Sequence, residues 1–393
     1  MFSRKERKAL STLLFKNIGC LVSGIINEPY CAGDSLFIKD GLIAAIGDAS
    51  PSEEDADLII DVQGATVAPG LIDSHVHPVL GDFTPRQNML GFIESSLHGG
   101  VTTMISAGEA HVPGRPKDPA GAKALAILCH KSSCNHRPAG VKLHGGALIL
   151  EKGLQEEDFD ELAAEGVWLV GEVGLGSVKE PEEAAQMICW AHRHGMKAMM
   201  HTGGTSIPGS SVVTADDVLT VQPDVASHVN GGPPAPSFKE IARLVSESQI
   251  ALEIVHCGNP KAADYAARLL LVKGELHRLI LGNDAPSGTG VIPLGILRVM
   301  AQLASLSEIS PAKVWAAASG NTARLYGLNT GRLEVGREAD LVVLDAPMGS
   351  VGEDAMEALT AGDLPGVALV LIDGQIVVKR SRNTPPPKRR PLL

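Results

Sequence analysis

The stretch Ala65–Pro78, ATVAPGLIDSHVHP, decides the fold and contains the most informative motif of the chain. An apolar run continues past Gly70 and ends in His75-Val76-His77. Residues i and i+2 of an extended strand point the same way, so both imidazoles can face one metal ion from a single strand end. Imidazole is a preferred ligand of zinc, iron and nickel. Alone, an H-x-H pair is a weak signal, because two solvated loop histidines explain it more often.

The composition favours a large α/β protein. The chain has 393 residues, of which 44% are hydrophobic and only 3% aromatic, and it contains 43 glycines. This length allows two or three domains, or one barrel with an appendage. The formal net charge of −11 argues against a nucleic-acid or anionic-membrane partner, because both require a basic surface.

The cysteines and the hydropathy pattern predict a cytoplasmic protein. The six cysteines form no C-x-x-C pair and no dense framework, which is typical of free thiols in a reducing compartment. Lys16 cuts the first apolar run too short for a signal-peptide core. No stretch approaches the ~18 uninterrupted apolar residues of a membrane span.

The centre of the chain alternates between strand-like and helix-like segments. Eight apolar runs end in glycine, polar residues or histidine: Thr66–His77, Thr102–Ser106, Gly140–Leu143, Val167–Glu172, Lys197–His201, Val225–His228, Ala251–Val255 and Leu279–Asp284. Helix-like segments lie between most of them, such as Asp158–Glu165, Glu180–His194, Ser237–Ser248 and Lys261–Lys273. This alternation predicts a parallel sheet, and eight repeats favour a (β/α)8 TIM barrel over residues 67–328.

The two ends of the chain carry short strand-like runs without helices between them. They are Ile18–Val22, Ser35–Ile38, Leu42–Ile46 and Leu58–Val62 near one end, and Ala339–Leu344, Val367–Ile372 and Ile376–Val378 near the other. We therefore predict a small discontinuous β-sandwich domain from residues 15–66 and 329–393, with the barrel inserted between its halves. Residues 1–14 are interpreted as an N-terminal extension.

Two further segments flank the second half of that small domain. Ser310–Tyr326 is predicted as one helix, with Ser310 as its N-cap and Pro311 at its first position. Lys379–Leu393 is basic and rich in proline. We interpret it as a solvated tail or as an arm onto a neighbouring subunit.

Potential metal ligands follow five of the eight predicted strands. In a TIM barrel, catalytic residues lie at the carboxyl ends of the strands. Any single histidine there is more often a satisfied core or loop residue, but six donors at the ends of five strands rarely coincide by chance. The predicted ligands are His75, His77, Glu172, His201, His228 and Asp284.

These motifs, together with Gly331–Leu341, which is close to a G-x-I-x-x-G-x-x-A-D-L signature, resemble the amidohydrolase superfamily. The resemblance implies two divalent metal ions in a binuclear centre. His75, His77 and Asp284 would hold one ion, and His201 and His228 the other. Glu172, together with a hydroxide, would bridge them at a position that is often a carboxylated lysine in the superfamily.

Several loop stretches resemble the enamidases, a branch of that superfamily: GEVGLGSV, MMHTGGTSIPGSS, SHVNGGPP, GNDAPSGTGVIPLGILR and SRNTPPPKR. The resemblance implies hydrolysis of a cyclic enamide in nicotinate degradation, namely 6-oxo-1,4,5,6-tetrahydronicotinate to 2-formylglutarate and ammonia. It also implies a mixed zinc and iron centre and a homotetramer. The bridging hydroxide would attack the ring amide carbonyl, and Asp284 would carry the proton to the leaving nitrogen.

The partner of the substrate carboxylate is less well defined by the sequence. For each candidate, a role as surface charge or turn residue is about as plausible as substrate binding. The candidates are Arg86, His111, Arg115, Lys142, Thr202 and Thr205.

Two other readings of the sequence keep the fold. The same centre could act on another cyclic amide or imide, or on an isoaspartyl peptide, because fold does not fix function. A non-catalytic structural oligomer is the other reading, and the complete set of six donors argues against it.

Overall fold

The computed structural model describes residues 11–47, 50–78, 89–112, 114–205, 210, 212–231, 234–285 and 292–393. Arg86, one of the candidate substrate-binding residues, lies outside them. No helix among the described residues is long and apolar enough to cross a membrane.

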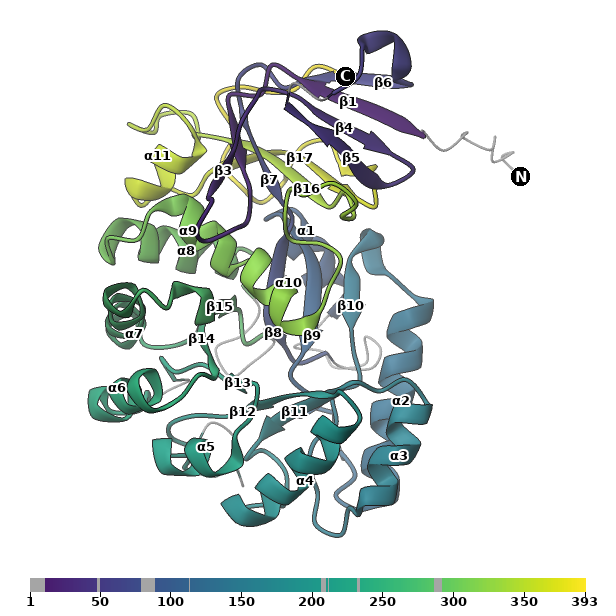
Figure 1. Ribbon diagram of the computed structural model, residues 1–393, viewed down its shortest axis with the longest axis vertical. Helices are drawn as coiled ribbons and strands as arrows, with labels where there is room; N and C mark the ends of the chain where they lie inside the picture. The colour runs from purple at the N-terminus through teal and green to yellow at the C-terminus, as the bar shows by residue number, and fades with distance from the viewer. Residues whose placement is uncertain are drawn as a thin grey trace.

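Eight parallel strands form the middle of the molecule (Figure 1). They are β8 (Leu71–Val76), β9 (Val101–Ser106), β10 (Lys142–His144), β11 (Leu169–Val173), β12 (Lys197–Met200), β13 (Val225–Ala226), β14 (Ala251–Val255) and β15 (Leu279–Gly282). They are arranged as one sheet in the order β10-β9-β8 and another in the order β11-β12-β13-β14-β15. Isolated parallel bridges, Val76 to Ala285 and Leu148 to Val170, join the two sheets at both pairs of edges.

Helices follow these strands and cover their outer side (Figure 1). The helices are α1 (Met89–Leu97), α2 (Pro119–Asn135), α3 (Glu156–Ala164), α4 (Pro181–Arg193), α5 (Ala215–Val221), α6 (Phe238–Glu247), α7 (Pro260–Lys273), α8 (Gly295–Leu306), α9 (Pro311–Ala317) and α10 (Gly320–Tyr326). A further helix, α11 (Ala355–Thr360), lies in the carboxyl-terminal part of the chain and follows none of these strands. In α6, Ser237 caps the amino end and Ile241, Leu244 and Val245 are buried. This i, i+3, i+4 spacing places one apolar stripe against the strands.

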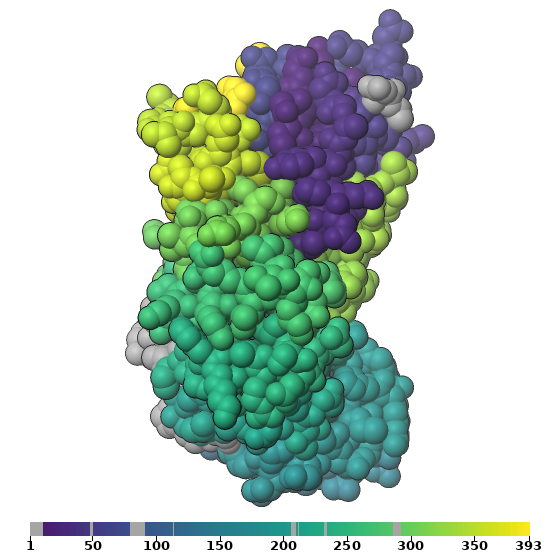
Figure 2. All heavy atoms as spheres, turned by 60° about the vertical axis from the view of Figure 1, so that its left-hand side comes forward, coloured from purple at the N-terminus to yellow at the C-terminus, as the bar shows by residue number. Residues whose placement is uncertain are grey.

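The terminal parts of the chain form two further sheets, the first from amino-terminal strands alone and the second from strands of both ends. One has the order β5-β4-β1-β6 and the other the order β18-β17-β16-β7-β2-β3. Their members are β1 (Thr12–Lys16), β2 (Cys20–Val22), β3 (Tyr30–Cys31), β4 (Leu36–Lys39), β5 (Leu42–Ile46), β6 (Leu58–Asp61), β7 (Thr66–Pro69), β16 (Leu341–Asp345), β17 (Gly366–Ile372) and β18 (Gln375–Val378). Figure 2 shows the first and last parts of the chain gathered at one end of the molecule. A separate apolar core, which includes Phe15, Ile38 and Leu371, lies within these sheets.

The boundaries near the amino end differ from the sequence prediction. Thr12–Lys16, part of which was assigned to an extension, is a central strand that pairs with β4 and β6, and its Leu13 and Phe15 are buried. The run Thr66–His77 is two strands rather than one. Its first part, β7, pairs with β16 and β2, so the terminal sheets extend to Gly70. A side chain at Gly70 would collide with Thr102, whose Oγ1 lies 2.2 Å from the ideal Cβ position.

The predicted helix Ser310–Tyr326 is two helices, α9 and α10. The carbonyl of Ala318 accepts a hydrogen bond of 2.8 Å from the backbone N–H of Ile72 in β8, so it is turned away from the helical path. Gly320 fits at the break because its Cβ position lies 1.9 Å from the carbonyl oxygen of Gly24. Tertiary contacts therefore interrupt a segment that was predicted as one continuous helix.

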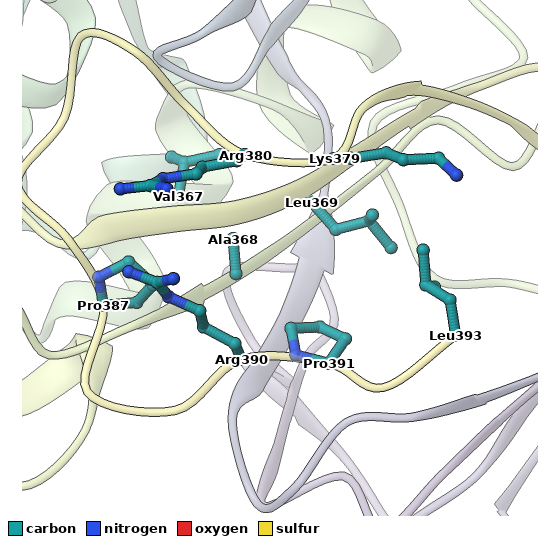
Figure 3. A pocket seen from close by; sticks show the side chains of 9 residues that line it. All are labelled: Val367, Ala368, Leu369, Lys379, Arg380, Pro387, Arg390, Pro391 and Leu393. Carbon is teal, nitrogen blue, oxygen red and sulfur yellow. The ribbon is translucent and has the colours of Figure 1, made fainter.

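The C-terminal tail packs on its own chain instead of extending into solvent. Leu392 and Asp61 exchange two backbone hydrogen bonds, and Arg389 donates to both carboxylate oxygens of Asp345. Tail residues and β17 line a small pocket of about 100 Å³ (Figure 3). The alternative role as an arm onto a neighbouring subunit stays a prediction.

An ion cluster around buried Lys142 and Asp340 connects the parallel strands to the terminal sheets. The ammonium of Lys142, on β10, lies 2.6 Å from Glu338, 2.7 Å from Asp340 and 2.7 Å from Asp373. Burial alone would lower the pKa of Lys142, but these carboxylates outweigh it and hold the pKa above its usual value. Its positive charge is therefore committed to the carboxylates of the terminal sheets.

Replacing Lys142 by methionine should destabilise the protein by about 3 kcal/mol, because the variant leaves buried Asp340 without its cation. Urea unfolding would measure the loss. Lys131→Met is the matched control: its ammonium pairs with Glu165 while 52% of its side chain is exposed, so its loss should stay below about 1 kcal/mol. Similar losses in both variants would contradict a stabilising role for the cluster.

Candidate metal centre

The six predicted donor residues lie together at the carboxyl ends of the parallel strands. His75 and Glu172 are the second-last residues of β8 and β11. The other four donors follow their strands by one or two residues. Imidazole and carboxylate atoms of His75, His77 and Glu172 lie within 4.8 Å of one another, as do those of Glu172, His201 and His228 and those of His75, His228 and Asp284. All six residues are buried in the structure.

Glu172 stands between two pairs of histidines. Its Oε2 lies 3.4 Å from Nε2 of His75 and 3.2 Å from Nε2 of His77. Its Oε1 lies 2.6 Å from Nε2 of His228 and 3.8 Å from Nδ1 of His201. One carboxylate therefore presents a different oxygen to each pair, which is the arrangement needed to bridge two cations.

The hydrogen bonds of His75 and His77 leave the Nε2 lone pairs of both rings facing the same point. His75 Nδ1 donates to Glu253 at 2.7 Å, and His77 Nδ1 donates to the carbonyl of Gly108 at 2.9 Å. In neutral rings both Nε2 atoms are then acceptors, yet they lie only 3.2 Å apart. Such an approach is unfavourable unless a proton or a metal ion lies between them, so these residues fit a metal ion.

The second pair follows the same logic. His201 Nε2 donates to the carbonyl of Gly204 at 2.7 Å, which leaves Nδ1 as the acceptor. That Nδ1 lies 3.2 Å from Nε2 of His228. The bond on its far ring nitrogen fixes the tautomer of His201, as is common for metal-bound histidine. Nδ1 of His228 has no hydrogen-bond partner among the described residues.

The electrostatics of the cluster require positive charge at this place. Burial alone would lower the pKa of His77, but Asp284 and Glu172 raise it to about 9. Burial would raise the pKa of Glu172, but His75 and His228 hold it well below its usual range. Protons and metal ions compete for such a site, and metal binding releases the protons. Two divalent cations fit this donor set.

The two carboxylate oxygens of Asp284 have different neighbours. Its Oδ1 lies 3.4 Å from Nε2 of His77 and 3.7 Å from Nε2 of His75, while its Oδ2 accepts a hydrogen bond of 3.0 Å from the thiol of Cys257. The backbone φ is 56° at Asp284 and 35° at His228. Residues other than glycine rarely adopt this left-handed backbone conformation. Such backbone strain is concentrated at functional sites.

Two predicted substrate-binding cations have other partners. Lys142 belongs to the ion cluster described above, and Nη1 of Arg115 pairs with the buried carboxylate of Glu151 at 2.5 Å. Neither side chain lies among the donor atoms of the centre. The expectation that they bind the substrate carboxylate finds no support in the structure, because each charge is already neutralised.

The other described candidates lie closer to the centre. The ring of His111 contacts that of His77 with centroids 5.1 Å apart, and burial lowers its pKa to about 4. Thr202 is buried, and its hydroxyl donates to the carbonyl of Ser227 at 2.7 Å. Thr205 is exposed in the loop after β12. Of these three, His111 offers a neutral polar ring beside the donor cluster.

Sequence reasoning missed one residue that touches the donor cluster. Glu253 lies inside β14, in a run that was interpreted only as an apolar strand. The signal for Glu253 was present, because a charged residue is rarely buried in an apolar strand unless it is paired. Cys257, just beyond the end of the same strand, is placed by the sequence where it could line the pocket, and its thiol donates to Asp284.

Comparisons with known proteins agree with this geometry. A model of the amidohydrolase family matches residues 228–377. The chain belongs to the amidohydrolase superfamily and is an enzyme of that class. Enamidase from Eubacterium barkeri is 61% identical over 381 residues, which cover 97% of this chain and 99% of the relative.

Solved structures extend the comparison. A crystal structure of enamidase superposes with a TM-score of 0.94 at 60% identity and covers 97% of this chain and 100% of that one. A β-aspartyl dipeptidase from Fervidobacterium islandicum AW-1 superposes with a TM-score of 0.67 at 16% identity, over 95% of this chain and 98% of that one. The second likeness shows a shared fold alone.

Proposed function

We propose that this protein is a metal-dependent hydrolase of a cyclic enamide, with 6-oxo-1,4,5,6-tetrahydronicotinate as substrate and 2-formylglutarate and ammonia as products. The observation that carries the proposal is the placement of Glu172, whose two oxygens face two different pairs of histidines. The identity of 61% with an enamidase over nearly the full chain supports the substrate class.

The architecture that we propose for this function is a TIM barrel with a small β-sandwich domain. The bridges at both pairs of edges of the parallel sheets support closure into one barrel. The sheet that combines strands from both ends of the chain supports the small domain, and β1 and β7 extend it to about residues 11–69 at the amino end.

In the proposed centre, His75, His77 and Asp284 hold one divalent cation, His201 and His228 hold the other, and Glu172 bridges them. When bound, the two cations would polarise the amide carbonyl and lower the pKa of water enough to supply hydroxide near neutral pH. That the metals are iron and zinc, and that the protein is a homotetramer, we propose on the sequence resemblance.

Asp284 is the proposed proton carrier. Its Oδ1 faces the donor cluster, so it can accept the proton of the attacking water as the new carbon–oxygen bond forms. It then returns this proton to the ring nitrogen as the amide carbon–nitrogen bond breaks. Cys257 donates to Oδ2 and limits rotation of the carboxylate during both transfers.

The remaining chemistry follows from the ring-opened product. That product is an enamine, and it tautomerises to an imine. A second water adds to the imine carbon and ammonia leaves, which gives the aldehyde of 2-formylglutarate. The overall reaction therefore consumes two waters for each ammonia released, and neither step needs an oxidant or a further cofactor.

Ammonia release from 6-oxo-1,4,5,6-tetrahydronicotinate by anaerobically purified protein tests the proposal. We expect release that a strong chelator abolishes and that added iron and zinc restore. A metal-loaded protein that releases no ammonia would retain the centre but overturn the substrate assignment. Undiminished release after complete removal of metal would overturn the metal-dependent mechanism.

A further inference from the structure

Glu253 is a fully buried carboxylate in the middle of β14, between the buried apolar residues Leu252 and Ile254. No lysine or arginine pairs with it among the described residues. A buried anion of this kind is costly unless hydrogen bonds and nearby positive charge compensate it. The groups that contact Glu253 therefore indicate why a carboxylate occupies this position of β14.

All of these partners belong to the donor strands. Oε2 of Glu253 accepts from Nδ1 of His75 at 2.7 Å, and Oε1 accepts from the hydroxyl of Ser74. Oε2 also lies 3.3 Å from the backbone N–H of His228. One side chain thus contacts a proposed ligand of each cation, His75 through its ring and His228 through its main chain.

The neighbouring strand leaves room for this contact. Gly282 on β15 has an ideal Cβ position 2.7 Å from Cβ of His75 and 3.2 Å from Oε1 of Glu253. A side chain at Gly282 would displace the histidine ring from the carboxylate. The pairing of His75 with Glu253 is therefore built into the packing of β8, β14 and β15.

We propose that Glu253 is a positioning residue of the metal centre, an inference that rests on the proposed function. It holds the His75 proton on Nδ1, so that the lone pair on Nε2 faces the first cation. Its negative charge makes that nitrogen more basic and partly offsets the charge of the cations. Its contact with the His228 main chain sets the position of a ligand of the second cation.

A purely structural role is the competing explanation, because a buried carboxylate with three partners also stabilises the fold. The two roles differ in what they change. A structural residue affects the unfolding of metal-free protein, whereas a positioning residue affects metal affinity even where metal-free stability is preserved. Partners of this kind commonly contribute 10- to 100-fold to metal affinity.

The test is the affinity of metal-free protein for zinc, measured by competition with a chromogenic chelator, beside the melting temperature of the same metal-free samples. Glu253→Gln keeps an acceptor for His75 but removes the charge, and should weaken zinc binding by roughly 10- to 100-fold. Ser74→Ala leaves the carboxylate in place without its second partner and should weaken binding by roughly fivefold. Visible spectra of the cobalt-substituted variants should also change.

Glu151→Gln is the matched control, because Glu151 is equally buried but pairs with Arg115 and the Ser177 backbone. Its zinc affinity should equal that of the unmodified protein. Equal affinity in the Glu253 and Glu151 variants would overturn the proposal, and so would unchanged affinity in Ser74→Ala should Glu253→Gln fail to fold. Unmodified protein that binds no zinc would instead overturn the proposed centre itself.

Discussion

Asp284→Asn should retain the fold and the melting temperature of metal-free protein but lower turnover by about 10³-fold or more. Asparagine is nearly isosteric and can still accept the hydrogen bond from Cys257, so the local structure survives. It cannot take a proton from water or return one to the ring nitrogen. The loss should therefore appear in kcat for ammonia release.

Metal content separates the two roles of Asp284. The amide is a weaker cation ligand, so activity must be expressed per bound metal. Asp264→Asn, on the outer helix α7 where Asp264 pairs with Arg268, is the control and should behave like the unmodified protein. Near-normal turnover in a fully metal-loaded Asp284→Asn variant would contradict the proton-carrier role.

Much of the candidate site could be predicted from sequence because each donor lies at or just beyond the carboxyl end of a strand-like run. Strand ends of parallel sheets meet on one side, so His75, His201 and His228 can be placed together without coordinates. A residue that acts from the middle of a strand lacks this signal. Glu253 lies inside an apolar run, and only its pairing with His75 from another strand gives it a role.

The sequence predicted the alternation of strands and helices, but not the boundaries between the parallel strands and the terminal sheets. The run from Thr66 to Ile72 contains no charged residue, and the Pro69-Gly70 pair is the only local sign that the chain leaves one sheet for another there. Likewise, Thr12–Lys16 follows a basic segment, and its burial depends on β4 and β6. Such boundaries are decided by pairing with distant strands, which outweighs local propensity.

The charges of Arg115 and Lys142 show the same limit. From sequence, a cation in a loop or strand near the expected site is a reasonable partner for a substrate carboxylate. In the structure both charges are neutralised by carboxylates of residues at least 36 positions away in the sequence. Composition counts charges, whereas only packing shows which of them are already neutralised.

Glu172→Gln should remove the ability of the centre to hold two cations and should lower activity by about 10³-fold or more. The reason is that the bridging carboxylate supplies both a negative charge and an oxygen for each pair of histidines. A glutamine offers one oxygen to one pair of histidines and an NH₂ group to the other. That NH₂ can donate to a lone pair of His228 or His77, which stabilises the metal-free state and excludes a cation from that side. Metal analysis should find at most about one ion per chain, against two in the unmodified protein.

The melting temperature of metal-free protein adds a second readout for this variant. The buried charge of Glu172 requires compensation by protonated histidines, and the glutamine removes that requirement. Metal-free Glu172→Gln should therefore melt no lower than metal-free unmodified protein, although it is inactive. Glu151→Gln again serves as the control for loss of a buried carboxylate and should keep both metals. A Glu172→Gln variant that retains two tightly held ions and normal turnover would contradict the bridging role, since the second oxygen would then be unnecessary.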